Sequence, residues 1–472
     1  MEKLFGLKKH NTTVRTEILA GLTTFMAMAY ILMVNANMFA NPFNDGTNVL
    51  GVSYGAIYIA TAISAVVGSL LIGLLANLPL AQASGMGLNA FFVYTVCVGF
   101  GLSYANALVL VLVDGIIFIV LTLTGLRKKI FTAIPDAVRK AIPAGIGLFI
   151  AFIGLQNAKI VIPSSSTGVT LASFNVLAGV PWATIMPMLV AIIALCIIAV
   201  LAKKNVRGSV LWGILGGAVL YYVLGFISVE GFADGVKSSL SVDFVGPFKD
   251  FFNLSFGKVF TEGINFTPYI KANGVGNFIL MFSTTALAFC MVDMFDTLGT
   301  LYGACARGNM LTEKGEVPNM DKAMLADAIA TTTGAICGTS TVTTFVESAA
   351  GVAEGGRTGL AAVSTAALFF IAMFLAPIAA LIPSCATAAA LIYVGVLMLA
   401  CVKDLDWHDP AVALPSFLTM AMMPFTYNIS FGIAFGLISY VIVKLCTGKL
   451  KEIKIGTWVI TLLFLVMLFL TH

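Results

Sequence analysis

Apolar stretches of about twenty residues recur along the whole chain, and this pattern limits the possible folds more than any other feature. A helix needs roughly 20 apolar residues to cross the hydrocarbon core of a bilayer. The chain is 59% hydrophobic and only 10% charged, whereas a soluble domain carries about 25% charged residues. We therefore predict an all-α polytopic membrane protein. The fifteen candidate stretches cover roughly residues 17–40, 55–77, 81–100, 102–124, 137–157, 182–202, 208–229, 276–304, 323–338, 339–354, 360–382, 384–402, 410–427, 429–446 and 456–471.

Basic residues gather in three places, and their distribution predicts how the chain is oriented. Four precede the first apolar stretch, five lie in the loop 127–140, and three lie in the loop 203–207. If every stretch crosses once, the three clusters face one side, which the positive-inside rule makes cytoplasmic. We expect a multi-pass protein of the plasma or inner membrane with a cytoplasmic N-terminus and no nucleic-acid site. The residues are Lys3, Lys8, Lys9, Arg15, Arg127, Lys128, Lys129, Arg139, Lys140, Lys203, Lys204 and Arg207.

Several kinds of chemistry have no motif in this sequence. The eight cysteines form no Cys-x-x-Cys pair, which argues against a metal site. FGKVF (256–260) and TGKLK (447–451) lack the glycine five residues before Gly-Lys that a P-loop needs. GTSTV (338–342) does not match the Gly-x-Ser-x-Gly nucleophile elbow. We therefore expect a protein that is no enzyme and has no cofactor or metal.

Two segments differ from the other apolar stretches because they are rich in glycine, serine and threonine. They are LPLAQASGMGLNAFF (78–92) and CGTSTVTTFVESAAG (337–351). The second contains a run of mostly β-branched and aromatic residues, 341–346, which favours an extended chain. Each segment then becomes apolar, so a half-helix is expected to begin near Gly87 or Val346. Broken segments in corresponding positions of two halves are typical of a transporter's binding site, where half-helix N-termini meet.

The two halves of the chain resemble each other. IPDAVRKAIPAGIGLFIAFIGL, from Ile134, is similar to IPSCATAAALIYVGVLMLACV, from Ile382. Since an odd number of crossings precedes the second half, we predict two inverted repeats, with segments one to seven in residues 1–229 and the others in 276–472. The polar connector 230–275 then lies on the extracytoplasmic side. FKDFFNLSFGKVF within it fits an interfacial amphipathic helix.

Acidic side chains lie inside the apolar stretches of the second half. Asp293 and Asp296 share one helix face, and no basic residue occurs in residues 272–306. Glu347 begins the half-helix of the second broken segment, and Asn89 has the matching place in the first. An ionised carboxylate at the centre of a membrane helix costs about 2.5–3.5 kcal/mol. These carboxyl groups are therefore expected to be protonated, hydrated in a cavity, or bonded to a ligand.

Two further aspartates have a structural interpretation beside the functional one. Asp114, near the middle of the fourth stretch, either bonds a neighbouring helix or takes part in function. Asp327, close to the start of a short stretch, is interpreted as structural or interfacial. The three histidines, His10, His408 and His472, are terminal or lie in a loop. Any proton coupling must therefore use carboxyl groups.

Four motifs together resemble the signatures of a known family. In chain order they are TTFMAMAYI (23–31), GMGLNAFF (85–92), DMFDTLGTL (293–301) and TTFVESAAGVAEGGRTGL (343–360). The chain is similar, nearly from end to end, to the AzgA-like purine permeases of the nucleobase–cation symporter 2 (nucleobase–ascorbate transporter) superfamily. This resemblance implies about fourteen transmembrane segments, one fewer than our fifteen stretches. The boundaries are least certain in the region 410–471, where TYNIS (426–430) separates either two spans or the arms of a re-entrant pair.

The resemblance also implies how the segments are used. Two inverted repeats of seven would place segments one to four and eight to eleven in a core domain. Segments five to seven and twelve to fourteen would form a gate domain. Segments three and ten would each contain a short strand and a half-helix. The implied function is import of adenine, guanine or hypoxanthine by proton symport, with an elevator or rocking movement of the core against the gate.

The family resemblance assigns site residues as well. Carboxylates would accept hydrogen bonds from purine N–H groups, half-helix amides would donate to ring nitrogens, and an aromatic side chain would stack on the ring. The same carboxylates can take up a proton. The expected substrate-binding residues are Asp293, Glu347, Asn89, Phe25, Phe345, Thr344 and Gly87, and the expected proton-coupling residues are Asp296, Asp293 and Glu347.

The expected partners are a purine nucleobase, a proton and the lipid bilayer, and a homodimer remains open. The alternative is a uracil- or xanthine-type nucleobase transporter, or an anion transporter, of the same fold. An anion site would be positive or neutral at the half-helices, so Asp293 and Glu347 argue against it. A channel would not need an inverted repeat around a closed site. A membrane enzyme would need a nucleophile or a metal set, which the sequence does not offer.

Overall fold

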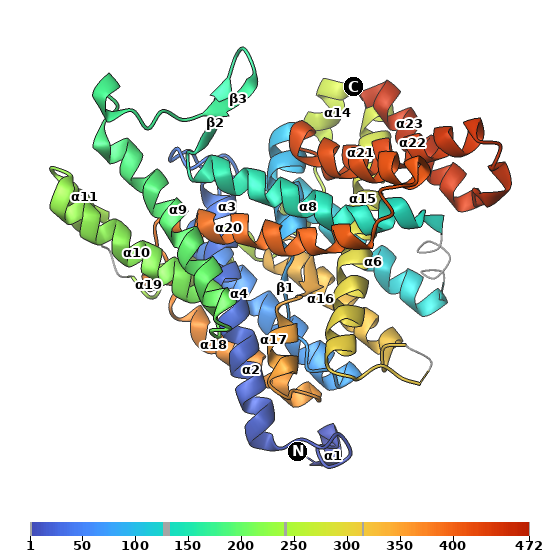
Figure 1. Ribbon diagram of the computed structural model, residues 1–472, viewed down its shortest axis with the longest axis horizontal. Helices are drawn as coiled ribbons and strands as arrows, with labels where there is room; N and C mark the ends of the chain where they lie inside the picture. The colour runs from blue at the N-terminus through green and yellow to red at the C-terminus, as the bar shows by residue number, and fades with distance from the viewer. Residues whose placement is uncertain (1, 126–132, 240–242, 314–315, 472) are drawn as a thin grey trace.

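Every apolar stretch forms a helix or a broken helical segment in the computed structural model, which describes residues 2–125, 133–239, 243–313 and 316–471 (Figure 1). In these described ranges, nine helices are long and apolar enough to cross a membrane, and four shorter apolar helices accompany them. The prediction of a mainly helical, multi-pass membrane protein is therefore confirmed, whereas the hairpin of residues 161–164 and 168–171 was not predicted. Three basic residues of the second loop cluster, Arg127, Lys128 and Lys129, lie outside the described residues.

The first half of the chain owes several helix starts to capping side chains. Thr13, Ser53 and Ser103 each accept a hydrogen bond from a backbone N–H of the first helical turn. Two helices continue as π-helix, at Ile72–Ala76 and Phe91–Gly99. The elements are α1 (Glu2–Phe5), α2 (Val14–Met28), α3 (Tyr30–Ala40), α4 (Tyr54–Leu71), β1 (Gln82–Ser84), α5 (Met86–Ala90), α6 (Tyr104–Thr124), α8 (Asp136–Asn157), β2 (Val161–Ser164), β3 (Gly168–Leu171), α9 (Trp182–Lys203) and α10 (Ser209–Ser228).

The second half follows a connector of short helices. Asp409 and Asn428 cap its helices α21 and α22 in the same way. The connector contains α11 (Phe232–Ser239), α12 (Gly246–Asp250), α13 (Lys258–Thr261) and α14 (Thr267–Asn273). The second half contains α15 (Val275–Arg307), α16 (Met320–Cys337), β4 (Val342–Thr344), α17 (Ser348–Ala353), α18 (Gly359–Met373), α19 (Ala376–Ala379), α20 (Ser384–Met398), α21 (Pro410–Thr426), α22 (Ile429–Cys446) and α23 (Ile455–Thr471).

The two broken segments meet inside the molecule, where a short strand of one pairs with a short strand of the other. β1 and β4 are antiparallel, with residues 82–84 opposite residues 342–344, and all of these residues are buried. Extended backbone at membrane depth needs such a protein partner, because lipid offers no hydrogen bonds. The extended chain predicted in 341–346 is confirmed for residues 342–344, whereas Val346 lies in a turn. Helices follow both strands, with α5 beginning at Met86 and α17 at Ser348.

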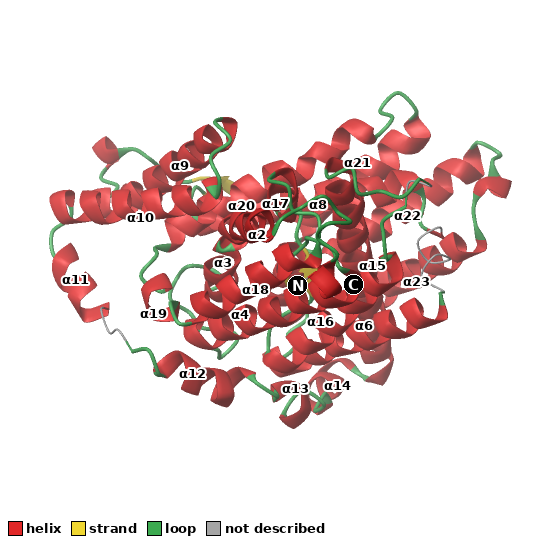
Figure 2. Cartoon of the chain, turned by 90° about the horizontal axis from the view of Figure 1, so that it is seen from below, coloured by secondary structure: helices red, strands yellow, loops and turns green. Residues whose placement is uncertain are grey.

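Most of the long helices lie in two layers, as the view in Figure 2 shows. The upper layer contains α9, α10, α20, α8, α21 and α22, and the lower layer contains α3, α18, α4, α16 and α6. In the upper layer α8 and α20 lie side by side in both views. Their backbones touch at two glycines: a Cβ on Gly395 would lie 2.4 Å from the carbonyl oxygen of Gly147. Small residues permit this close approach of membrane helices.

Replacing Gly395 by alanine is expected to lower the thermal stability of the protein. The added Cβ would collide with the Gly147 backbone and would lie 2.7 Å from the Cβ of Ala151. Overpacking of this kind costs about 1–3 kcal/mol. The melting temperature of the purified protein in detergent measures the effect. Gly303→Ala is the matched control, because no heavy atom of the described residues lies within 4 Å of its added Cβ. An unchanged melting temperature for Gly395→Ala would contradict the prediction.

The polar connector runs along the lower layer (Figure 2). α12 packs on α4, α13 on α6, and α14 on α15. The stretch 248–260, predicted as one interfacial helix, is divided in two. One helix covers residues 246–255, and α13 begins at Lys258, because Gly257 adopts a left-handed backbone with φ 72°. Phe252, Phe256 and Phe260 are exposed. The connector therefore keeps the apolar exposed face expected of an interfacial segment, although it is not a single helix.

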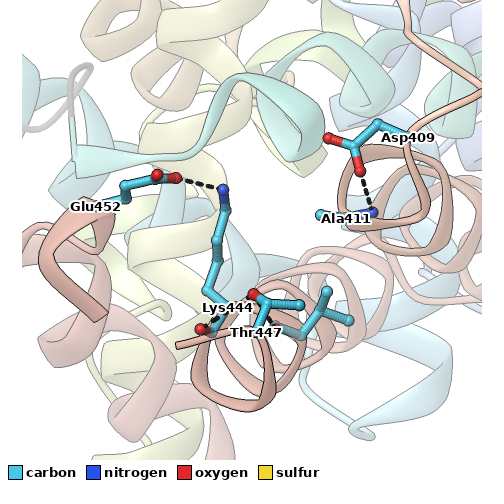
Figure 3. A network of polar contacts seen from close by, with 6 residues as sticks. Asp409, Ala411, Lys444, Thr447 and Glu452 are labelled. Carbon is cyan, nitrogen blue, oxygen red and sulfur yellow. Dashed lines mark hydrogen bonds and ion pairs between the residues drawn. The ribbon is translucent and has the colours of Figure 1, made fainter. Parts of the chain in front are cut away.

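The region 410–446, where the number of spans was open, folds as a helical hairpin. α21 and α22 pack against each other and form the hairpin. Polar groups gather at its open end: Lys444 Nζ lies 2.5 Å from Glu452 Oε2, and Asp409 caps the start of α21 (Figure 3). α23 follows and packs on α15 and α22. α23 therefore accounts for the last of the fifteen apolar stretches.

Candidate functional site

A small cavity of about 60 Å³ lies where the two broken segments cross. The pairing of β1 with β4 builds it, because this pairing brings residues 85–87 next to residues 343–347. α3, α15 and α20 supply the remaining lining residues. The lining residues are Tyr30, Gly85, Met86, Gly87, Asp296, Thr343, Thr344, Phe345, Val346, Glu347, Val394 and Met398.

The two carboxyl groups of the cavity accept hydrogen bonds from hydroxyl groups. Tyr30 Oη donates to Glu347 Oε1 at 2.6 Å. Thr343 Oγ1 donates to Asp296 Oδ2 at 3.3 Å. The carboxyl groups are close enough to interact electrostatically, and no basic residue is among the described residues that line the cavity. The site therefore offers hydrogen-bond acceptors to a ligand with N–H donors.

The opposite wall of the cavity is apolar. On this side α20 contributes only Val394 and Met398. Gly87 lies where α5 meets α8, and a Cβ at this position would be 2.3 Å from Ile146 Cγ2. Glycine therefore lets the half-helix approach the upper layer closely. Every hydrogen-bonding side chain among the described lining residues belongs to α3, α15 or the second broken segment.

The structure brings five of the eight predicted site residues into the cavity lining. Phe25, one of the two aromatic candidates, is not among them. It packs edge-on against Phe369, with the ring centroids 5.2 Å apart. Of the two aromatic candidates, Phe345 is therefore the one placed to contact a ligand ring. The five residues in the lining are Gly87, Asp296, Thr344, Phe345 and Glu347.

Asn89 and Asp293 are fully buried and lie outside the cavity lining. Asn89 Oδ1 accepts a hydrogen bond from Ser84 Oγ at 2.6 Å, within the first broken segment. Asp293 Oδ2 accepts one from Thr331 Oγ1 of α16 at 3.2 Å. Asn89 therefore stabilises the first broken segment, and Asp293 stabilises the contact of α15 with α16, without facing the cavity.

Several polar residues in or beside the cavity were not predicted as site residues. Gln82 Nε2 donates to Asp327 Oδ1 at 2.9 Å. The hydroxyl groups of Thr297 and Thr344 donate to the same oxygen at 2.9 and 3.3 Å. Asp327 is fully buried in this network, and Tyr30 holds Glu347 from the other side. Gln82 and Tyr30 could have been found because each places an amide or hydroxyl group in a largely apolar motif. Asp327 was considered but was interpreted as structural or interfacial.

Other features of the described residues do not offer a comparable site. In the described part of the chain, no group of three or more His, Cys, Asp or Glu side chains could hold a metal ion. A larger cavity of about 670 Å³ lies near the ends of α8, α10 and α20. Its described lining includes Asn37 and Lys159 but no Asp or Glu. We therefore place the candidate site in the smaller cavity, where polar groups converge.

Comparisons with known proteins identify the family of the chain. Residues 15–435 match the model of a family described as a permease family. The guanine/hypoxanthine permease PbuG of Bacillus subtilis (strain 168) is 39% identical over 472 residues, which cover 99% of this chain and 100% of PbuG. PbuO, a guanine/hypoxanthine permease of the same organism, is 38% identical, with 99% and 100% covered. The adenine permease AdeP of Escherichia coli (strain K12) is 35% identical, with 98% and 95% covered.

Two solved transporter structures have a similar fold. The transmembrane domain of a cyanobacterium bicarbonate transporter, BicA, has a TM-score of 0.60 at 17% identity, covering 90% of this chain and 97% of that chain. SLC26A9 has a TM-score of 0.61 at 13% identity, covering 92% of this chain and 66% of that chain. The full-length relatives are permeases and not enzymes, which confirms the expectation of a transporter. With its family match and these relatives, the chain belongs to the permease family.

Proposed function

We propose that this chain is a secondary active transporter that imports adenine, guanine or hypoxanthine by proton symport. The observation that carries the proposal is the presence of two carboxyl groups, Asp296 and Glu347, beside Phe345 in one cavity at the crossing of the broken segments. The names of the relatives, adenine permease and guanine/hypoxanthine permease, support the substrate class.

A purine fits the chemistry of this cavity. Its edges present N–H donors and ring-nitrogen acceptors, and its faces are flat and apolar. Glu347 and Asp296 would accept hydrogen bonds from the ring N–H groups, and Phe345 would stack on the ring face. The first backbone N–H groups of α5 have no partner within the helix and would donate to a ring nitrogen. Tyr30 would orient Glu347 through its hydrogen bond.

The same carboxyl groups would hold the coupled proton. Asp296 and Glu347 interact electrostatically, so both cannot easily be ionised in a poorly hydrated site. We assign the coupling role to Asp296, and both substrate binding and coupling to Glu347. Asn89 and Asp293 would keep the site in place from behind. The proton gradient would supply the energy, and no cofactor would be needed.

We also propose that the chain consists of two inverted repeats, residues 1–229 and 276–472. Gly147 and Gly395, which occupy equivalent positions in the two halves, face each other across the α8–α20 contact. The helix contacts have counterparts as well: α6 packs on α16 as α18 packs on α4, and α9 packs on α20 as α21 packs on α8. The antiparallel pairing of β1 with β4 supports the inversion. The two repeats then contain seven segments each, fourteen in all, and α23 is an additional helix after the second repeat.

The proposed core contains the segments from α2 to α6 and from α15 to α18, and the proposed gate contains α8 to α10 and α20 to α22. The two layers in Figure 2 support this division. Val394 and Met398 form the gate's side of the cavity and offer no hydrogen bond. An elevator or rocking movement of the core against the gate would therefore break no polar contact across the cavity. The basic clusters support a cytoplasmic N-terminus in the plasma or inner membrane.

Uptake by cells that lack their own nucleobase permeases tests the function. The cells express this chain and receive labelled adenine, guanine, hypoxanthine, xanthine or uracil in turn. We expect uptake of at least one of the first three bases above the level of cells with an empty vector. Uptake of xanthine or uracil alone, or transport of bicarbonate without any purine, would favour the alternative of another transporter with this fold.

Unlabelled adenosine is expected to inhibit the uptake of labelled adenine at least about tenfold more weakly than unlabelled adenine does. A steric conflict that costs about 1.4 kcal/mol already weakens binding tenfold. The physical reason is that Val394 and Met398 of α20 line one side of the cavity, so a ribose attached to the base would collide with them. The measurement is inhibition of labelled adenine uptake by increasing concentrations of unlabelled adenosine or adenine. Equal inhibition by the nucleoside and the base would contradict the proposed size limit.

A further inference from the structure

Three fully buried carboxyl groups lie outside the cavity lining. They belong to Asp114 of α6, Asp293 of α15 and Asp327 of α16, and each residue is 0% exposed. α6 packs on both α15 and α16. The packing is tight near Asp114, since a Cβ on Gly115 would lie 2.5 Å from Thr332 Oγ1. We call Asp114, Asp293 and Asp327 the buried acid cluster.

The oxygens of the buried acid cluster have too few hydrogen-bond donors. Asp327 Oδ1 and Asp293 Oδ2 accept hydrogen bonds from neighbouring side chains. Asp327 Oδ2, Asp293 Oδ1 and both oxygens of Asp114 have no hydrogen-bond partner among the described residues. A buried carboxylate oxygen without a donor is strongly unfavourable. Four such oxygens in neighbouring residues therefore indicate that the cluster binds something that supplies donors and positive charge.

The members of the cluster face one another. Asp293 of α15 accepts a hydrogen bond from Thr331, one turn after Asp327 on α16. Asp327 accepts one from Thr297, one turn after Asp293 on α15. Both carboxyl groups therefore lie in the same α15–α16 contact. Asp114 is close enough to both to interact electrostatically. An ionised carboxylate only accepts hydrogen bonds, whereas a protonated one has an O–H donor. Both oxygens of Asp114 lack a partner among the described residues, so a proton on Asp114 would make it a donor to the unpartnered oxygen of Asp293 or Asp327.

No base among the described residues compensates the charge of the cluster. Among the described residues, the other titratable groups that interact with the cluster are Cys290 and Asp296, both on α15. The Cys290 thiol lies beside Asp114 and is only a weak donor. The cluster therefore faces further acids and no described Lys, Arg or His, so its three carboxyl groups cannot all be ionised together.

We propose that the buried acid cluster is a second proton-binding site, which carries a coupling proton apart from the purine. This inference rests on the proposed proton symport. A proton from water on the outer side binds a carboxylate oxygen, and the resulting O–H donates to the neighbouring carboxylate. On the inner side this O–H bond breaks, and the proton returns to water while the carboxylate is restored. The class of ligand is therefore the proton, bound between two acid side chains.

The cluster is connected to the cavity by hydrogen bonds. Asp327 Oδ1 accepts from Thr344 Oγ1 at 3.3 Å, and Thr344 lines the cavity. Thr297 donates to the same oxygen. Protonation of the cluster changes the charge behind the strand that carries Thr344. Proton binding and purine binding can therefore influence each other although the proton does not touch the purine.

A proton fits the cluster better than a metal ion. Hard cations such as Ca²⁺ and Mg²⁺ take about six or more oxygen ligands that converge on one point. The described residues contain no group of three acid side chains arranged to hold a metal ion. A shared proton needs only two neighbouring oxygens, and the cluster offers four oxygens without a partner among the described residues.

Asp114→Asn tests the inference, because Asp114 does not line the cavity and asparagine has nearly the same shape without a titratable proton. Thr122→Val is the matched control: on the same helix it removes another buried oxygen that has no partner among the described residues, but no acid. The purified proteins are reconstituted into liposomes. The experiment measures exchange of labelled for unlabelled purine at equal pH, accumulation driven by an acidic exterior, and protons taken up per purine. Asp114→Ser, which has a smaller neutral side chain, is a second variant that keeps the test possible if Asp114→Asn does not fold.

We expect purine exchange by the Asp114 variants to stay within about twofold of wild type, while protons per purine fall by about one. Accumulation at a gradient of one pH unit should then fall about tenfold, the equivalent of one proton at that gradient. Thr122→Val should match wild type in all three measurements.

Unchanged proton uptake and accumulation in a well-folded Asp114 variant would overturn the inference and leave the proposed function intact. Loss of exchange together with coupling in both variants would overturn it as well, because that result indicates a structural role. So would accumulation by wild type that follows a sodium gradient and not a proton gradient. Absence of all purine exchange in wild type would instead refute the proposed function, and the inference with it.

Discussion

Replacing Glu347 by glutamine is expected to reduce purine uptake about 10- to 150-fold, because hydrogen bonds to a charged group contribute about 1.5–3 kcal/mol. Glutamine keeps the size of the side chain but loses the charge and presents an amide group where the purine needs an acceptor. Glu347 accepts from Tyr30 at 2.6 Å, so the surrounding structure keeps a donor for the amide oxygen. Initial rates of labelled purine uptake, normalised to the amount of inserted protein, measure the effect.

Glu354→Gln is the matched control for this experiment. Glu354 directly follows the same short helix, α17, but forms an ion pair with Arg207 at a partly exposed position away from the cavity. Exposed ion pairs contribute only about 0–1 kcal/mol, so this variant should transport nearly as well as wild type. Near-normal uptake by well-folded Glu347→Gln would show that the glutamate does not bind the substrate.

Uptake by the wild type is expected to rise as the external pH falls toward about 5–6, and to collapse when a protonophore removes the proton gradient. In Asp296→Asn the rise with acidity should be much weaker, because a titratable group of the cavity has been replaced by a neutral amide. Exchange of internal for external purine needs no net proton movement, so it should suffer less than uphill uptake. The measurements are uptake at stepped external pH and exchange at equal pH on both sides.

The matched control is Asp250→Asn, which neutralises an aspartate of the connector outside the cavity lining. Its pH profile should follow that of wild type. The proton mechanism would be refuted if a sodium gradient drives uptake and a protonophore at constant membrane potential does not slow it. A full pH response in Asp296→Asn would instead remove Asp296 from the mechanism and shift the coupling role to Glu347 or to the buried acid cluster.

The membrane-spanning architecture could be predicted because bilayer thickness fixes the length of an apolar helix. The broken segments were visible for a different reason: Ser, Thr and Gly residues in 78–92 and 337–351 interrupt the apolar pattern. Element boundaries were less certain. The second half-helix begins at Ser348 and not at Val346, because the extended chain and a turn occupy the preceding residues.

The composition of the cavity could be predicted only in part. The pairing of residues 82–84 with 342–344 joins segments far apart in the chain. No local pattern in the sequence shows that these two strands pair. The sequence therefore did not show that Gln82 reaches Asp327, or that Tyr30 reaches Glu347. These contacts depend on the tertiary fold.

Asp293 and Asp296 show how helix geometry separates two neighbouring carboxyl groups. A spacing of three residues places them on one broad face, but still about 60° and 4.5 Å apart on an ideal helix. Asp296 lines the cavity, whereas Asp293 reaches α16 and the buried acid cluster. Helical periodicity predicted their proximity, and only the packing of α15 against its neighbours distinguishes their surroundings.

One side of the cavity is polar and the other is apolar, so under the proposed function a purine derivative could fail to be transported for two different reasons. A substituent on the edge that faces Asp296 and Glu347 would remove N–H donors, and the compound would not bind. A bulky substituent on the opposite edge would leave those hydrogen bonds intact but would collide with Val394 and Met398 of α20, which would block the movement of the core against the gate. Such a compound would occupy the site without being carried. One purine scaffold, substituted at either edge, would therefore yield either an inert compound or a blocker that holds the transporter in one conformation.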